Sequence, residues 1–154
     1  MPYNPDSAIS YAHKWAFLRN PRYANFDPMG GDCTNFISQC VFAGGFPMNY
    51  SASNGWFFNS LSSRSPSWSG VEFLRNFIVG NRGTGPKGSD GAVTQARLGD
   101  IIQLSFDGVT FGHSLLVVGF NGSDPLITTH TYDSDNRPLS SYMYSKARAI
   151  LINN

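Results

Sequence analysis

The residues best suited to chemistry form a short segment in which two glycines and an acid precede a cysteine. Cys33 follows Gly30-Gly31-Asp32 and opens the apolar, helix-compatible run 33–43. A thiol at a helix N-terminus faces the positive end of the helix dipole and the unpaired first-turn amides, which favour the thiolate. The same amides can hold a developing oxyanion. The segment therefore predicts a nucleophilic cysteine in the first turn of a helix.

Glycines and an acid frame this predicted helix. Gly30-Gly31 lets the backbone turn sharply and approach a ligand closely. Asp32 is an acceptable N-cap, and Gly44-Gly45 supplies a left-handed stop. Cys40 would share the helix with Cys33 at ~10 Å, which is too far for a disulfide. Both cysteines should therefore be free thiols.

Two histidines supply the partners that a nucleophilic cysteine needs. His113 begins one strand-like pattern, His130 lies in the next, and Asn121-Gly122 between them is a strong hairpin signal. Counting from that turn places the two histidines nearly opposite each other, ~5 Å apart on one face. This spacing predicts a relay in which His113 takes the proton of Cys33 and returns it to a leaving amine. His130 would fix the tautomer of His113.

The elements that position these residues are helices first and strands second. Apolar spacing predicts helices over 6–19 and 33–43, and a capping box at 69–72 opens a third predicted helix that runs through Leu74, Phe77 and Ile78 and is ended by Gly80. Alternating patterns predict strands over 100–106, 113–120, 126–132 and 147–152. The segment 81–91 is expected to be a mobile linker because it is rich in glycine. The fold class is therefore α+β, with N-terminal helices packed on an antiparallel sheet.

Length and charge predict a single domain that does not bind nucleic acid. The 154 residues predict one domain, 1–154, large enough for a hydrophobic core. Charged residues make up 14% and the net charge is +1, so nucleic acid is not expected as a partner. No apolar run approaches ~18 residues, so no membrane span is expected. The N-terminus lacks a signal peptide, but an excised domain would look the same, and the oligomeric state is left open.

Several residues outside the relay are candidates for substrate contact. Trp56 lies within the irregular stretch 46–67 and Trp68 directly follows it, and the two either line a substrate groove or cap the core. Asp32 and Asn35, beside the cysteine, either contact substrate or tie down the preceding loop. His13 falls on the flank of the first helix and is interpreted as a surface residue.

The sequence resembles the bacterial amidase domain family often called amidase 6. The resemblance rests on the segment 30–45, Trp56, Ser67-Trp68, 99–102, His113-Ser114 and 129–131. It covers nearly the whole chain, and its most specific part is Asp32-Cys33-Thr34-Asn35-Phe36. That family is similar to papain-like cysteine hydrolases, beside the NlpC/P60 and CHAP cell-wall enzymes.

The resemblance implies a papain-like fold that hydrolyses amide bonds, such as those of peptidoglycan stem peptides or related peptides. By position it implies Cys33 as nucleophile and His113 as base, and it implies a protein that is secreted or associated with the cell wall. NlpC/P60 enzymes carry a histidine as third member, whereas CHAP and papain relatives use a carboxylate or amide. Asp133 or Asp135 could therefore replace His130, although the hairpin count favours His130. Asp133 is also a candidate for substrate contact.

Two rival interpretations remain open. Cys33, Cys40, His113 and His130 could nominally bind a metal ion, but the Cys-x6-Cys spacing is wrong for a usual zinc knuckle, and we expect no cofactor. The second rival is a peptide-binding or wall-binding module that keeps the fold without turnover. It predicts that ligand binding is unchanged in Cys33→Ala.

Overall fold

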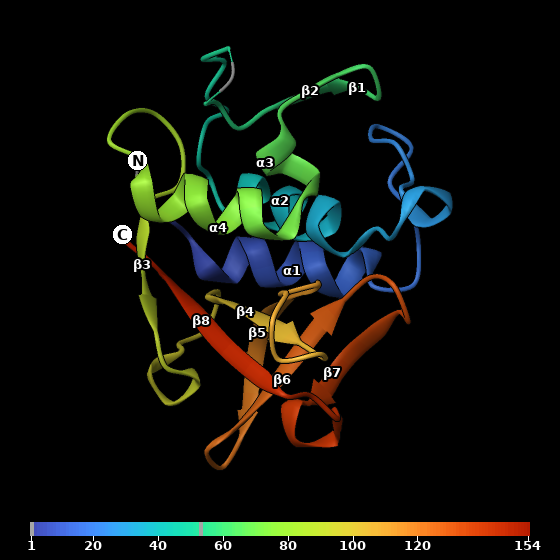
Figure 1. The fold of residues 1–154 in the computed structure, drawn as a ribbon, viewed down its shortest axis with the longest axis vertical. Coiled ribbons are helices and arrows are strands. Elements are labelled where there is room, and N and C mark those ends of the chain that lie inside the picture. The colour runs from blue at the N-terminus through green and yellow to red at the C-terminus, as the bar shows by residue number, and fades with distance from the viewer. Residues whose placement is uncertain (1, 53) are drawn as a thin grey trace.

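Helices cover one side of an antiparallel sheet in the computed structural model, which describes residues 2–52 and 54–154. Figure 1 shows the helices α1, α2 and α4 grouped together on one side and the sheet on the other. The first half of the chain supplies the helices, and the second half supplies the sheet. The predicted α+β class is confirmed.

The helices begin close to the predicted residues. They are α1 (Pro5–Trp15), η1 (Asp27–Met29), α2 (Cys33–Ala43), α3 (Pro66–Ser69) and α4 (Val71–Gly80), with short 3-10 turns η2 (Val93–Gln95) and η3 (Leu139–Ser141). Asn4 caps α1 by accepting a hydrogen bond from the Ser7 amide at 3.2 Å. Gly45, at φ +111°, follows α2 in the left-handed conformation that favours glycine. The predicted capping box before α4 is wrong, because Gly70 occupies the N-cap without a side-chain bond.

The main sheet has six strands in the order β3-β8-β4-β5-β6-β7, and all neighbours are antiparallel. The strands are β3 (Gly88–Gly91), β4 (Ile101–Ser105), β5 (His113–Asn121), β6 (Asp124–Thr129), β7 (Ser134–Pro138) and β8 (Lys146–Ile152). The four predicted strands form its centre. The edge strands β3 and β7 were not predicted, since polar and glycine-rich sequences gave no alternation. A separate two-stranded ribbon, β1 (Phe58–Ser60) and β2 (Ser63–Arg64), lies in the stretch expected to be irregular.

A bulge in β5 decides which face the two histidines occupy. Asn121 pairs with Asp124 at the hairpin tip, but the register shifts by one residue between Val117 and Gly119. Leu116 then pairs with Thr128, and continuing that register places Ser114 across from His130. A one-residue shift moves side chains to the opposite face. The expectation that the two histidines share a face is therefore wrong, because the hairpin count omitted the bulge.

Two apolar clusters lie on the two faces of the sheet. Ile101 and Leu116 pack with the helices, whereas Ile102 and Leu115 belong to the cluster on the other face. Within the described residues, no helix is long and apolar enough to cross a membrane. The faces matter for the site because successive residues of β5 alternate between them.

Candidate active site

Cys33 is the first residue of α2, as predicted, and its side chain is buried, with the residue 6% exposed. The sulfur lies 3.7 Å from the Thr34 hydroxyl, and the Ser114 amide also donates toward it. Burial raises the pKa of the Cys33 thiol, and these donors oppose that rise only in part. The nearby Asp32 charge raises the pKa further. The lowered pKa expected from the helix terminus is thus outweighed by burial.

A chain of buried polar side chains runs beneath the cysteine. The hydroxyls of Thr34 and Ser114 are 2.9 Å apart, and Gln103 Nε2 donates to the Ser114 hydroxyl at 3.2 Å. Gln103 Oε1 accepts from Arg148 Nη2 at 2.7 Å. Sequence reasoning missed Gln103 and Arg148. Polar residues at facing positions of two apolar strands were the signal that could have found Gln103.

His113 directly precedes Ser114, whose hydroxyl lies 2.9 Å from that of Thr34, but the His113 ring is turned toward other neighbours. Its ring centroid is 6.3 Å from Phe106 and 6.2 Å from Tyr142. His113 pairs with Leu104, so strand alternation directs it to the face opposite α2. Within the part of the chain that the structure describes, no hydrogen bond joins either ring nitrogen to the Cys33 sulfur.

Burial also sets the charge state of His113, which is 5% exposed. Removal from water and, to a smaller extent, the positive charge of Arg137 together lower the pKa of His113 to about 4. The imidazole is therefore neutral near pH 7. A neutral ring can accept a proton, which is what the predicted role requires.

His130 does not orient His113, and this predicted contact is corrected. Its Nδ1 lies 2.5 Å from Asp32 Oδ2, and its Nε2 lies 2.8 Å from the Trp15 carbonyl oxygen. Arg19 Nη1 is 3.2 Å from the same Nε2. With the hydrogen on Nδ1 the ring donates to Asp32 and its Nε2 can accept from Arg19, whereas with the hydrogen on Nε2 the ring donates to the Trp15 carbonyl oxygen. The ring also stacks on Phe36 with centroids 3.8 Å apart, so its surroundings hold it in place.

Asp32 and Asn35 tie down the loop that leads into α2. Asp32 Oδ1 accepts from the Phe26 amide at 2.8 Å and from Asn35 Nδ2 at 2.9 Å. The Asp32 side chain makes no N-cap bond. Asn35 Nδ2 also donates to the Ala24 carbonyl at 2.9 Å, and its Oδ1 accepts from Trp68 Nε1 at 2.9 Å. Of the two expected roles, the contacts are those of loop anchoring.

The two tryptophans belong to the core and do not line a groove. Trp56 and Trp68 are each 0% exposed, and their ring centroids are 4.8 Å apart. Trp56 Nε1 donates to Ser38, so the polar edges of both rings have internal partners. Indoles with satisfied N–H groups pack well in cores. The groove interpretation is therefore not supported, and the core interpretation holds.

The remaining carboxylates lie in ion pairs rather than beside His113. Asp133 accepts from Arg19 Nη1 at 3.0 Å and from Nη2 at 2.9 Å. Asp135 contacts His13 Nδ1 at 2.7 Å, and His13 is an exposed residue in this surface pair. Arg19 was missed by sequence reasoning because nothing local distinguishes it from other surface arginines.

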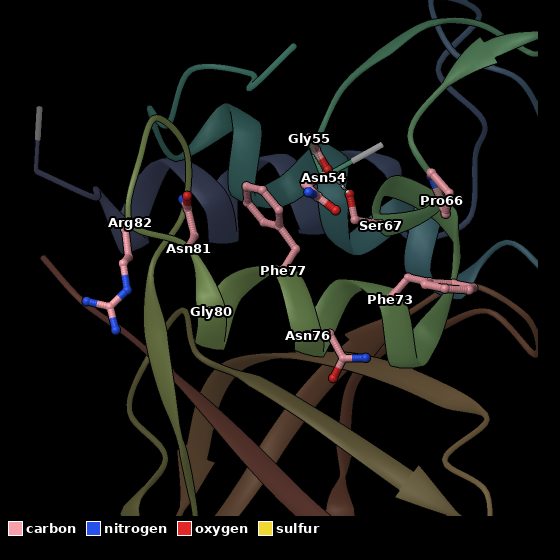
Figure 2. A pocket seen from close by; sticks show the side chains of 10 residues that line it. All are labelled: Asn54, Gly55, Pro66, Ser67, Phe73, Asn76, Phe77, Gly80, Asn81 and Arg82. Atoms are coloured by element: carbon pink, nitrogen blue, oxygen red, sulfur yellow. Dashed lines mark hydrogen bonds between the residues drawn. The ribbon is translucent and has the colours of Figure 1, made fainter. Parts of the chain in front are cut away.

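Among the described residues, neither the pocket along α4 nor a cluster of metal ligands includes Cys33. A pocket of about 540 Å³ runs along α4, and Figure 2 shows Phe77 reaching toward Asn54 and Gly55 there. Its described lining contains none of the predicted site residues. Among residues 2–52 and 54–154, no group of three or more His, Cys, Asp or Glu side chains is arranged to hold a metal ion. Cys40 is buried in the core, away from such a role.

Comparisons with known proteins point to one family. The family model described as "Putative amidase domain" matches residues 2–153. The chain is 37% identical to uncharacterized protein YhbB of Bacillus subtilis (strain 168) over 143 residues, which are 88% of this chain and 43% of that protein. It is 26% identical to uncharacterized protein YjcM of the same organism over 104 residues, which are 68% of this chain and 23% of that protein. The chain thus spans less than half of each relative, and no solved structure matches it.

Proposed function

Because the chain belongs to the "Putative amidase domain" family, we propose that it hydrolyses amide bonds with Cys33 as nucleophile and His113 as base. The observation that supports this proposal is that Cys33 begins α2 and that the hydroxyl of the next residue, Thr34, lies 2.9 Å from the hydroxyl of Ser114. Ser114 directly follows His113 in the chain. Nucleophile, first-turn amides and an imidazole are the parts that a cysteine hydrolase needs.

The proposed reaction has two halves. His113 accepts the thiol proton, and the sulfur attacks the amide carbonyl carbon, so that a C–S bond forms and the carbonyl oxygen becomes an oxyanion held by amides of the first turn of α2. His113 then gives the proton to the leaving amine as the C–N bond breaks. Water next loses a proton to His113 and attacks the thioester. The C–S bond breaks, the acid leaves, and the proton returns to sulfur.

The reaction includes an approach of the His113 ring to the sulfur. Catalytic hydrogen bonds are commonly long without substrate and tighten in the complex. His113 is the first residue of β5 and follows Gly112, where an added Cβ would meet nothing within 4 Å. We place the required backbone change at this junction.

The substrate class and setting are proposals that rest on the resemblance to amidase 6 domains. We propose a papain-like fold in which the cysteine helix faces the antiparallel sheet. The substrate would be a peptide amide, such as one in a peptidoglycan stem, and the protein would act outside the cell or at its wall. A histidine that can return a proton suits this class because a peptide amide leaves as an amine that must be protonated.

Mass spectrometry of purified muropeptides tests the proposal. Incubation with the chain should produce two fragments whose masses sum to the parent plus one water. Cys33→Ala should produce none, whereas Cys40→Ala, which changes the other buried thiol, should retain turnover once folding is verified. Equal product from Cys33→Ala and the parent chain would refute the mechanism.

A binding module without turnover is the second candidate. It is favoured by the raised pKa of the Cys33 thiol and by the orientation of His113 away from α2. Under this reading, the parent chain and Cys33→Ala bind muropeptides equally and neither changes their mass. The same incubation therefore separates the two candidates.

A further inference from the structure

Arg19 joins three carboxylates below the turn that leads to Cys33. Its Nε lies 3.1 Å from Asp27 Oδ2 and 3.4 Å from Asp32 Oδ2, and its Nη1 and Nη2 contact Asp133. These carboxylates come from the lead-in to α2 and from the turn after β6. A guanidinium presents several donors in a fixed fork, so one side chain fixes the two segments together.

Asp32 is the buried member of this cluster. It is 0% exposed, and its Oδ2 meets His130 Nδ1 and Arg19 Nε while its Oδ1 accepts two further bonds. A carboxylate can stay ionised when buried only if donors and cations surround it. Asp32 immediately precedes Cys33, and its charge opposes thiolate formation there. Cations that offset the Asp32 charge therefore influence how readily the Cys33 thiol loses its proton.

The turn after His130 is held in an unusual conformation against Asp32. Thr131 and Tyr132 have φ values of +58° and +60°, in the left-handed region that residues other than glycine rarely adopt. The Asp32 amide donates to the Thr131 hydroxyl at 2.8 Å. Strained backbone persists only where its surroundings fix it, and it clusters at functional sites. Here the fixing contacts are this bond and the pair between Arg19 and Asp133.

We propose that Arg19 is a positioning residue for Cys33, because it compensates the buried Asp32 charge and holds the 130–133 turn against the start of α2. For its catalytic consequence this inference rests on the proposed function, but its effect on the thiol does not. Besides Asp32, the groups near the sulfur are the polar Thr34 and Ser114, whereas His113, one residue away on β5, faces the other side of the sheet. Arg19 does not contact the reacting atoms, so it acts through Asp32.

The test measures how the rate of Cys33 alkylation by iodoacetamide depends on pH, with the modified peptide identified by mass spectrometry. Arg19→Met leaves Asp32 less compensated, so the midpoint of the pH profile should rise by about 0.5 to 1 unit, which is about three- to tenfold less thiolate at pH 7. Asp32→Asn keeps the shape of the side chain without its charge and should lower the midpoint. Combined with Asp32→Asn, Arg19→Met should cause a smaller shift than in the parent chain, because the carboxylate that Arg19 holds in place is no longer charged.

Two further variants separate charge from folding. Arg19→Lys keeps the charge without the fork and should keep the midpoint near that of the parent chain, whereas a merely structural role predicts the same change as in Arg19→Met. Arg75→Met, which removes an exposed pair with Asp90 elsewhere, is the matched control and should leave the midpoint unchanged. If Arg19→Met does not fold, the alkylation midpoints of Arg19→Lys and Asp32→Asn still test the inference.

Two outcomes would overturn the inference. One is an unchanged midpoint in folded Arg19→Met, or in Asp32→Asn if Arg19→Met does not fold. The other is an equal Arg19→Met shift with and without Asp32→Asn. Failure of the proposed function would show separately, as turnover that survives Cys33→Ala.

Discussion

His113 begins β5 and His130 directly follows the neighbouring strand β6, yet their surroundings differ in kind. His113 is enclosed by Phe106 and Tyr142, and burial keeps its ring neutral by lowering its pKa to about 4. His130 meets a carboxylate at one nitrogen and a backbone carbonyl at the other. Two identical side chains are thus given opposite tasks by their partners.

The contrast indicates which histidine is suited to proton transfer. A base needs a neutral ring with a nitrogen available to the reacting group, and His113 meets the first condition. A ring engaged at both nitrogens is suited to holding charge in place, as His130 does for Asp32. The bulge at Val118 is the cause of the separation, because it turns the two histidines to opposite faces.

The largest effect should come from removing the proposed base. His113→Ala is expected to lower kcat for amide hydrolysis about 10²- to 10⁴-fold, which is the usual contribution of general acid–base catalysis. His130→Ala should lower it by a smaller factor, since that ring acts only on position. Steady-state kinetics on the muropeptide substrate measures both. A greater loss in His130→Ala than in His113→Ala would reverse the assignment of roles.

The stability of the fold should depend strongly on His130. His130→Ala removes the partner of a buried carboxylate and a stacked ring, so the free energy of unfolding should fall by about 3 to 5 kcal/mol. His13→Ala is the matched control, because its pair with Asp135 is partly exposed and should cost under about 1 kcal/mol. Urea denaturation measures both. Similar losses in the two variants would show that His130 is not a buried anchor.

Acid should destabilise the fold through His113. Its ordinary pKa of 6.5 applies in the unfolded chain and about 4 applies when folded, so between these values the unfolded chain binds the additional proton. The stability present above pH 6.5 is therefore lost as the pH falls toward 4, by up to about 3 kcal/mol. His113→Gln should lack this part of the pH dependence. An unchanged profile in that variant would contradict burial of a neutral ring.

The smallest effect concerns the aromatic wall of His113. Tyr142 Oη is buried and, among the described residues, has no hydrogen-bond partner. Removing a hydroxyl without a partner costs little, so Tyr142→Phe should change the free energy of unfolding by less than about 0.5 kcal/mol or increase it. Thermal and urea unfolding check this. A loss above about 1 kcal/mol would indicate that the hydroxyl is bonded in solution.

Much of the fold was readable because its signals are local. The cysteine helix has a glycine stop and apolar spacing, and the central strands alternate, so α2, β4, β5, β6 and β8 were expected near their observed bounds. The edge strand β3 was missed because Gly88–Gly91 carries no apolar residue, and its pairing with β8 is a tertiary effect. Intrinsic strand signals are weak where packing decides.

The candidate site was readable only in part. Cys33 at the helix start follows from its neighbours, and the free thiols follow from spacing. The partner of His130 could not be predicted. One unpaired residue, Val118, moves His130 to the other face of the sheet, and nothing in the sequence marks this bulge. Arg19 contacts residues far along the chain, such as Asp133, and only the tertiary fold brings them together.

Trapping of the acyl-enzyme is the sharpest test of Cys33 as the nucleophile. The chain is mixed with muropeptide, quenched in acid after a few turnovers, digested and examined by mass spectrometry. We predict that the peptide containing Cys33 gains the mass of the acyl fragment, and that Cys33→Ala gains nothing and releases no product. Product formation by Cys33→Ala at the rate of the parent chain, with no adduct on either, would contradict the account.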